Sequence, residues 1–215
     1  HKEYRRQRQM CIRDRLCADA KFNDQVWPYP ELDAIATSGI VVNQTGFRIA
    51  DEGLGGINLA NMLAQQPRGS RFFAIFDAGI WDGPGTSARI PANPLLEKAG
   101  GTIHRADTLD ELALQIQVPV DALIKTISGY NAALENSNLE ELPISRSKKI
   151  SPFPIQSAPF MAIGLLPGIT YTMGGIMIDE HSQVLDTNGT PIPGLLAAGS
   201  TTGGLEGGSQ TAYLG

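Results

Sequence analysis

The chain has 215 residues, a formal net charge of −5 at pH 7 and two cysteines. This length allows one large domain or parts of two. No apolar run approaches the ~20 residues needed to cross a bilayer. The acidic balance argues against a nucleic-acid or anionic-membrane partner, whose surface would repel it. We expect a cytoplasmic protein without a membrane span.

The first segment, residues 1–15, has no apolar periodicity, and six of its residues are Lys or Arg. A nucleic-acid arm, a targeting peptide and a disordered tail are all compatible with it. We favour a fourth interpretation, because Arg5–Arg15 resembles the translation of a transposase adapter used to fragment DNA for sequencing. We therefore expect 1–15 to be a disordered leader outside the fold. Without it, 11 basic and 20 acidic residues remain, a net charge of −9, and Cys17 is the sole cysteine.

Alternating strand and helix patterns follow. Residues 40–49 predict a hairpin around the turn residues Asn43–Gly46. Helical spacing covers 57–66, and strands are predicted at 71–77 and 101–107.

A capping box begins at Thr108, with Glu111 three residues later, and predicts a helix to about Gln117. Pro119 suits the first turn of a second helix. The apolar face of that helix would hold Leu123, Ile127, Tyr130 and Leu134.

The C-terminal part is rich in glycine and in short strands. Residues 136–154 are polar and predict a connection, and turns are expected at 179–182 and 188–189. The stretch GLLAAGSTTGGLEGG (194–208) predicts a buried strand at Leu195–Ala198. The glycine loop after it indicates backbone that approaches another surface closely. His104, His181 and Cys17 show no metal-ligand spacing.

Two stretches carry a resemblance to a known family. PGITYTMGGIMID, followed by VLDTNGTPIPGLLAAGSTTGGLEGG, resembles the C-terminal part of the fumarate reductase and succinate dehydrogenase flavoprotein family, which includes ketosteroid dehydrogenases. VVNQTGFRIADEG resembles the substrate-capping domain of the same family. The similarity covers roughly residues 36–215.

This resemblance implies an α/β fold that binds FAD: an α+β capping domain plus the β-rich C-terminal return of a Rossmann-like FAD-binding domain, truncated at both ends. It divides the chain into the end of a first FAD-domain segment (16–35), the capping domain (36–150) and the return (151–215). Such an internal fragment would not be expected to hold FAD by itself. The cofactor-binding residues it implies are Tyr171, Thr172, Gly199, Ser200, Gly203, Gly204 and Gly207.

Departures from the family pattern bear on the substrate. Trp81 stands where fumarate reducers place a proton-donating arginine, and Gln210 where they place a carboxylate-binding arginine. Thr170 and Tyr171 replace tandem histidines, while Glu52 keeps the family's acid in the cap. We therefore expect Trp81, Gln210 and Thr170 to contact substrate.

The implied activity is hydride transfer between flavin and a C–C bond next to a carbonyl, with Tyr171, Tyr213 and Glu52 as catalytic candidates. A neutral cyclic ketone or enone is the expected small-molecule substrate, and the electron acceptor is left open. A fumarate-like dicarboxylate reductase is the alternative within the family. A non-catalytic flavin-binding or scaffold protein, and a β-rich ligand-binding module without flavin, are alternatives from other classes.

Overall fold

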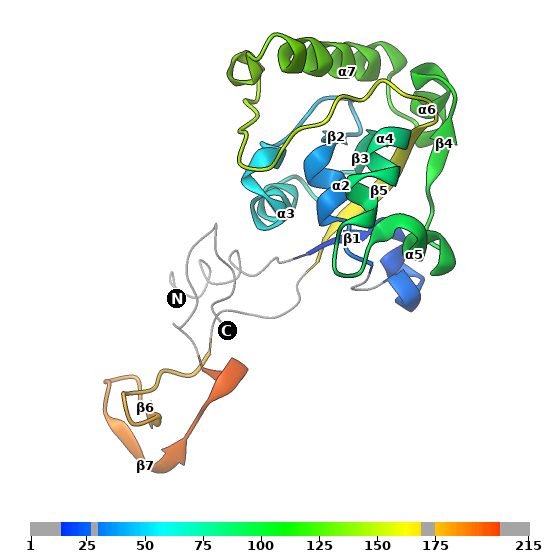
Figure 1. Ribbon diagram of the computed structural model, residues 1–215. Helices are drawn as coiled ribbons and strands as arrows, with labels where there is room; N and C mark the ends of the chain where they lie inside the picture. The colour runs from blue at the N-terminus through cyan, green and yellow to red at the C-terminus, as the bar shows by residue number, and fades with distance from the viewer. Residues whose placement is uncertain (1–13, 27–29, 169–174, 203–215) are drawn as a thin grey trace.

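A five-stranded antiparallel sheet organises most of the chain (Figure 1). The computed structural model describes residues 14–26, 30–168 and 175–202. Strand β5 (Phe160–Gly168) is central, with β3 (Phe72–Asp77) along one side and β2 (Ile40–Asn43) beyond it. Along its other side β5 pairs with β4 (His104–Ala106) near its start and with β1 (Asp14–Cys17) near its end. Every residue of β3 is buried, as expected for an interior strand.

Helices surround this sheet and connect its strands (Figure 1). The α-helices are α2 (Asp33–Ser38), α3 (Gly56–Ala64), α4 (Ala78–Asp82), α5 (Ala92–Lys98), α6 (Leu109–Ile116) and α7 (Val120–Glu135). The 3-10 helices are η1 (Ala18–Lys21), η2 (Asp24–Val26), η3 (Glu52–Leu54), η4 (Pro84–Thr86), η5 (Leu139–Glu141) and η6 (Gly199–Thr201). Within the three described ranges, none of these helices combines the length and the apolar character that a membrane crossing needs.

The predicted cap and apolar face of the paired helices are confirmed. The Thr108 side chain accepts a hydrogen bond from the backbone N–H of Glu111, and α6 ends at Gln117 in the left-handed conformation. On α7, Leu123, Ile127 and Tyr130 are buried in the core and Leu134 packs against it. The hairpin predicted at 40–49 is also present, although its return consists of a single bridge between Val42 and Arg48.

Strand β1 includes the last two residues of the segment 1–15, which we expected to lie outside the fold. Asp14 and Arg15 were expected to be unpacked, but they pair with Gly168 and Pro167 of β5. The unpaired edge of β5 next to β4 offers free backbone groups, and β1 satisfies them. Residues 1–13 lie outside the described part.

The sheet body does not end at the expected division near residue 150. Strand β5 pairs with both β3 and β4, so the sheet extends to Gly168. The division into capping domain and C-terminal return therefore stays a prediction, and strand pairing in this chain does not follow it.

A two-stranded hairpin, β6 (Gln183–Leu185) with β7 (Pro191–Leu196), stands apart from the sheet body in Figure 1. The strand predicted at 195–198 exists in part, but the prediction that it is buried is wrong. Leu195 and Leu196 are 46% and 65% exposed. A two-stranded ribbon buries a face only when another layer covers it, and the described residues supply none here.

Candidate functional site

Glu52 lies at the start of η3, directly after the hairpin that begins with β2, and its side chain is fully buried. Its Oε1 accepts hydrogen bonds from the Val41 backbone N–H at 2.9 Å and from Arg48 Nε at 3.2 Å. Its Oε2 lies 2.5 Å from Arg48 Nη2 and 3.8 Å from Arg146 Nε. A buried carboxylate thus faces two guanidinium groups, one local and one from a distant segment.

Arg146 brings the segment after η5 to this carboxylate, and its side chain is also fully buried. Its Nη2 donates to the Thr37 carbonyl at the end of α2, at 2.6 Å, and its Nη1 to the Ile150 carbonyl at 3.1 Å. Burial lowers the pKa of Arg146, while the nearby Glu52 acts in the opposite direction. A Cβ at Gly53 would lie 1.9 Å from Arg146 Nη1, so only glycine leaves room for this guanidinium.

Two further polar side chains complete the network. Asp51 accepts hydrogen bonds from the backbone N–H groups of Gly53 and Ser147, each at 2.9 Å. The Tyr130 hydroxyl, on α7, donates to the Phe153 carbonyl at 3.0 Å, and burial raises the pKa of Tyr130 to about 12. The network therefore joins the hairpin, α2, α7 and the 144–153 connection. A catalytic role for Glu52 stays a prediction.

Trp81 lies on α4, and Asp77 is the N-cap of this helix. The Asp77 carboxylate accepts from the Ile80 backbone N–H at 3.0 Å, and from those of Gln156 and Ser157 at 2.9 Å each, which fixes the start of the helix. The Trp81 ring is buried, with only 8% of the residue exposed, and stacks on Phe76 with ring centroids 6.0 Å apart.

Arg105, on β4, has a contact that the sequence analysis missed. Its guanidinium carbon lies 5.6 Å from the centroid of the Trp81 ring, and the same guanidinium forms an ion pair with Glu97. No local pattern indicates this contact, because Arg105 and Trp81 are brought together by the pairing of β4 with β5. The Trp81 ring is thus approached by an arginine from another strand.

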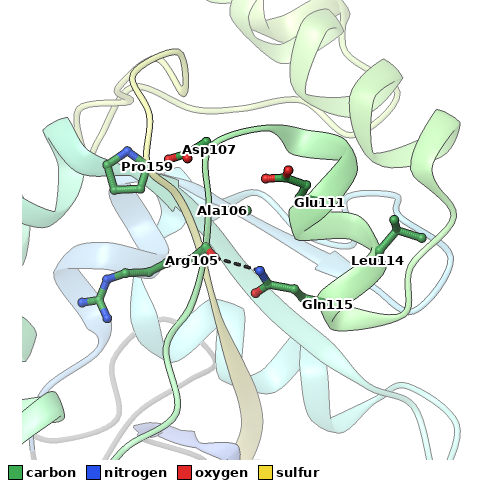
Figure 2. A pocket seen from close by; sticks show the side chains of 7 residues that line it. All are labelled: Arg105, Ala106, Asp107, Glu111, Leu114, Gln115 and Pro159. Atoms are coloured by element: carbon green, nitrogen blue, oxygen red, sulfur yellow. Dashed lines mark hydrogen bonds between the residues drawn. The ribbon is translucent and has the colours of Figure 1, made fainter.

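Figure 2 shows a pocket of about 430 Å³ between β4 and α6, to which Arg105 also contributes. The guanidinium of Arg105 points to the side of β4 away from α6. On the α6 side, Gln115 Nε2 donates to the Arg105 carbonyl at 2.8 Å and so covers part of the edge of β4. Asp107 and Glu111 are the acidic residues of the lining.

The glycine loop is described only at its beginning. Gly199 has φ 71°, a conformation that favours glycine, and no atom of the described residues lies within 4 Å of the place where a Cβ would stand. Ile176 forms a parallel bridge with Thr202, and its N–H donates to the Thr201 carbonyl at 2.8 Å. Ile176, just after the implied cofactor residues Tyr171 and Thr172, therefore lies beside Thr201 and Thr202 of the glycine loop.

The other implied site residues lie outside the described part of the chain. At Gly199 the loop fits a flavin contact, because no side chain among the described residues obstructs its backbone. Ser200 follows it in η6. The residues that fall outside are Thr170, Tyr171, Thr172, Gly203, Gly204, Gly207, Gln210 and Tyr213.

Comparison with known proteins shows which family the chain belongs to. A family described as FAD binding domain matches residues 27–212. An NADH:acrylate oxidoreductase of Vibrio harveyi is 39% identical over 51% of this chain and 11% of its own length. A 4-oxocyclohexanecarboxylate 2-dehydrogenase of Sinomonas cyclohexanicum is 30% identical over 76% of this chain and 31% of its own length. The open conformation of a flavocytochrome c3 fumarate reductase superposes with a TM-score of 0.64 and 25% identity, over 90% of this chain and 31% of that one.

The chain belongs to this FAD-binding family, since the match covers most of its residues. The mixed helix-and-strand fold is that of a portion of an FAD-binding α/β flavoprotein, as the sequence predicted. The chain spans less than a third of the length of each of these three proteins.

Proposed function

We propose that this chain is part of an FAD-dependent oxidoreductase that transfers hydride between the flavin and a C–C bond next to a carbonyl, in a neutral cyclic ketone or enone. Membership of the FAD-binding family supports the cofactor and the reaction class. Bound FAD supplies the hydride-transfer chemistry. Of this chain, Tyr171, Thr172, Ser200 and the glycines of the 199–207 loop would hold it.

The observation that carries the substrate class is the setting of Trp81. Clamping a dicarboxylate suits arginine, whose guanidinium presents a fixed fork of donors. At this motif position the protein instead has a buried indole stacked on Phe76. Loss of a charged partner for a buried carboxylate costs about 2–5 kcal/mol, or roughly 30-fold to several thousand-fold in affinity. Together with the neutral Gln210, this favours an uncharged substrate.

The roles that we propose for Tyr171, Tyr213 and Thr170 follow from the chemistry of a ketone. Its carbonyl needs a hydrogen-bond donor and its adjacent carbon a proton acceptor, and Tyr171 or Tyr213 would fill these roles. Thr170 would line the substrate site. The Sinomonas relative supports the assignment, because its name states a cyclic ketone as substrate, although that ketone also carries a carboxylate.

The direct test uses the full-length, FAD-loaded enzyme of which this chain is a part. Its oxidised flavin is mixed without oxygen with a cyclic ketone or with succinate. We expect the ketone to bleach the flavin absorbance and succinate to leave it unchanged. Bleaching by succinate alone would overturn the proposed substrate class. Bleaching by neither compound would overturn the reaction class.

A carboxylate substrate is the second candidate, and Arg105 is the observation in its favour. The guanidinium 5.6 Å from the Trp81 ring would restore a cation beside the motif position. Arg71 is a matched control, since its guanidinium carbon lies 5.8 Å from the Phe73 ring centroid. Under this alternative, Arg105→Gln raises KM for fumarate and Arg71→Gln does not. Under the ketone proposal, neither variant changes KM for the enone.

A further inference from the structure

A pocket of about 290 Å³ lies between the hairpin turn, α7 and the residues after η5. Phe47 stands at the hairpin turn with 52% of its surface exposed, although it is a large aromatic residue. Leu142, Pro143 and Ile144 also line the pocket, so its walls are mostly apolar. None of the lining residues belongs to the implied flavin loop or to the predicted substrate positions. An open, apolar cavity of this kind is a typical site for a small ring-shaped molecule.

Gly129 keeps the floor of this pocket open. It lies within the 16-residue helix α7, where glycine is less favourable than alanine. Packing does not require glycine there, because a Cβ would meet no atom of the described residues within 4 Å, and its φ is not positive. The same residue lines a second pocket of about 250 Å³ further along α7, so its missing side chain leaves space shared by both cavities.

The charges in this lining all have one sign. Arg48 and Lys125 contribute cations, and no acidic residue lines the pocket, although the whole chain carries a net charge of −5. The charge of Arg48 is matched by Glu52. Lys125 is exposed, and in the described part of the chain it has no ion pair. The pocket therefore offers an apolar floor with one uncompensated positive charge at its rim.

We propose that this pocket binds a small aromatic or alicyclic carboxylate, with its ring among Phe47, Leu142 and Pro143 and its carboxylate beside the Lys125 ammonium. The ring would cover apolar surface that is now exposed to water. The carboxylate would pair with a cation at the edge, where it keeps part of its hydration. A flat ring needs the space above Gly129, and a larger side chain at that position would fill it.

The test uses the full chain and two probes, 1-naphthoate and the uncharged 1-naphthylmethanol, with dissociation constants measured by calorimetry. We expect both probes to bind, naphthoate about two- to five-fold more tightly, as for an ion pair exposed to solvent. Lys125→Gln is expected to remove this preference. Lys98→Gln, on α5, is the control and is expected to keep it.

Gly129→Leu tests the cavity itself. Leucine is a better helix former than glycine, so α7 is expected to stay folded while the affinity for both probes falls at least ten-fold. Ser128→Leu changes the neighbouring exposed residue, which does not line the pocket, and is expected to leave binding unchanged. Unchanged binding by Gly129→Leu, or no binding by the unmodified chain at millimolar probe, would overturn the proposal. A naphthoate preference that persists in Lys125→Gln would overturn the role of the lysine.

Discussion

Arg48 and Glu52, four residues apart, form an ion pair at 2.5 Å in which the side chains are 6% and 0% exposed. Glu52 also faces the buried Arg146, so its carboxylate balances guanidinium groups that water does not reach. We expect Glu52→Gln to lower the free energy of unfolding by about 3–5 kcal/mol, because it leaves buried cations without their partner. Urea unfolding followed by circular dichroism measures this change.

The control for that substitution is the exposed pair of Glu31 with Arg89, whose side chains are 30% and 75% exposed. We expect Glu31→Gln to change the stability by less than about 1 kcal/mol, as for other pairs in solvent. Equal effects of the two substitutions would mean that the Glu52 network does not hold the hairpin to the 144–153 connection.

Gly53 and Gly129 should respond to alanine in opposite directions. At Gly53 a Cβ would lie 1.9 Å from Arg146 Nη1 and 2.0 Å from the Ser147 carbonyl oxygen, so Gly53→Ala is expected to destabilise by more than about 1 kcal/mol. At Gly129 the space is open, and Gly129→Ala is expected to stabilise by about 0.5–1 kcal/mol. Thermal unfolding of both variants tests the two signs together.

The cap of α6 gives a third prediction. The Thr108 hydroxyl accepts from the Glu111 backbone N–H, so Thr108→Ala is expected to cost about 0.5–2 kcal/mol. Thr102→Ala is the matched control. Thr102 donates to Asp19 through its backbone N–H, so alanine keeps this hydrogen bond. A loss of stability no larger than that of the control would show that the cap contributes nothing.

Alkaline pH should destabilise the fold through Tyr130. Burial raises the pKa of Tyr130 from 10.0 to about 12, so the folded state holds this proton more tightly than the unfolded state does. The associated stability is complete below pH 10 and is lost as the pH rises toward 12. The buried Cys17, whose pKa burial also raises to about 12, acts in the same direction.

Tyr130→Phe separates these two contributions. It is expected to cost about 1 kcal/mol at neutral pH, because the Phe153 carbonyl loses its hydrogen-bond donor. It should also make the loss of stability above pH 10 shallower. A pH profile identical to that of the unmodified chain would contradict the role of Tyr130.

Local patterns predicted the local structure. The cap at Thr108, the apolar face of α7 and the strand β3 each depend on residues close in sequence, so local pattern alone was sufficient. The position of Glu52 after the hairpin was likewise readable from a motif. Its fully buried setting was not, because the partner Arg146 lies in a stretch whose charges are typical of solvent-exposed connections.

Long-range pairing accounts for the errors. The pairing of β1 with β5 and the contact of Arg105 with Trp81 both depend on how distant strands line up. The prediction that Leu195 and Leu196 are buried was wrong for a related reason, since both are exposed. An apolar strand is buried only when another layer covers it, and sequence alone does not reveal whether that layer is present.

The proposed reaction is tested most directly by reoxidation of reduced flavin. The full-length, FAD-loaded enzyme is reduced without oxygen and mixed in a stopped-flow instrument with either cyclohex-2-enone or fumarate, each at the same concentration. The account predicts rapid return of the oxidised flavin absorbance with the enone and a rate with fumarate that does not exceed the buffer control. Rapid reoxidation by fumarate with no response to the enone would contradict it.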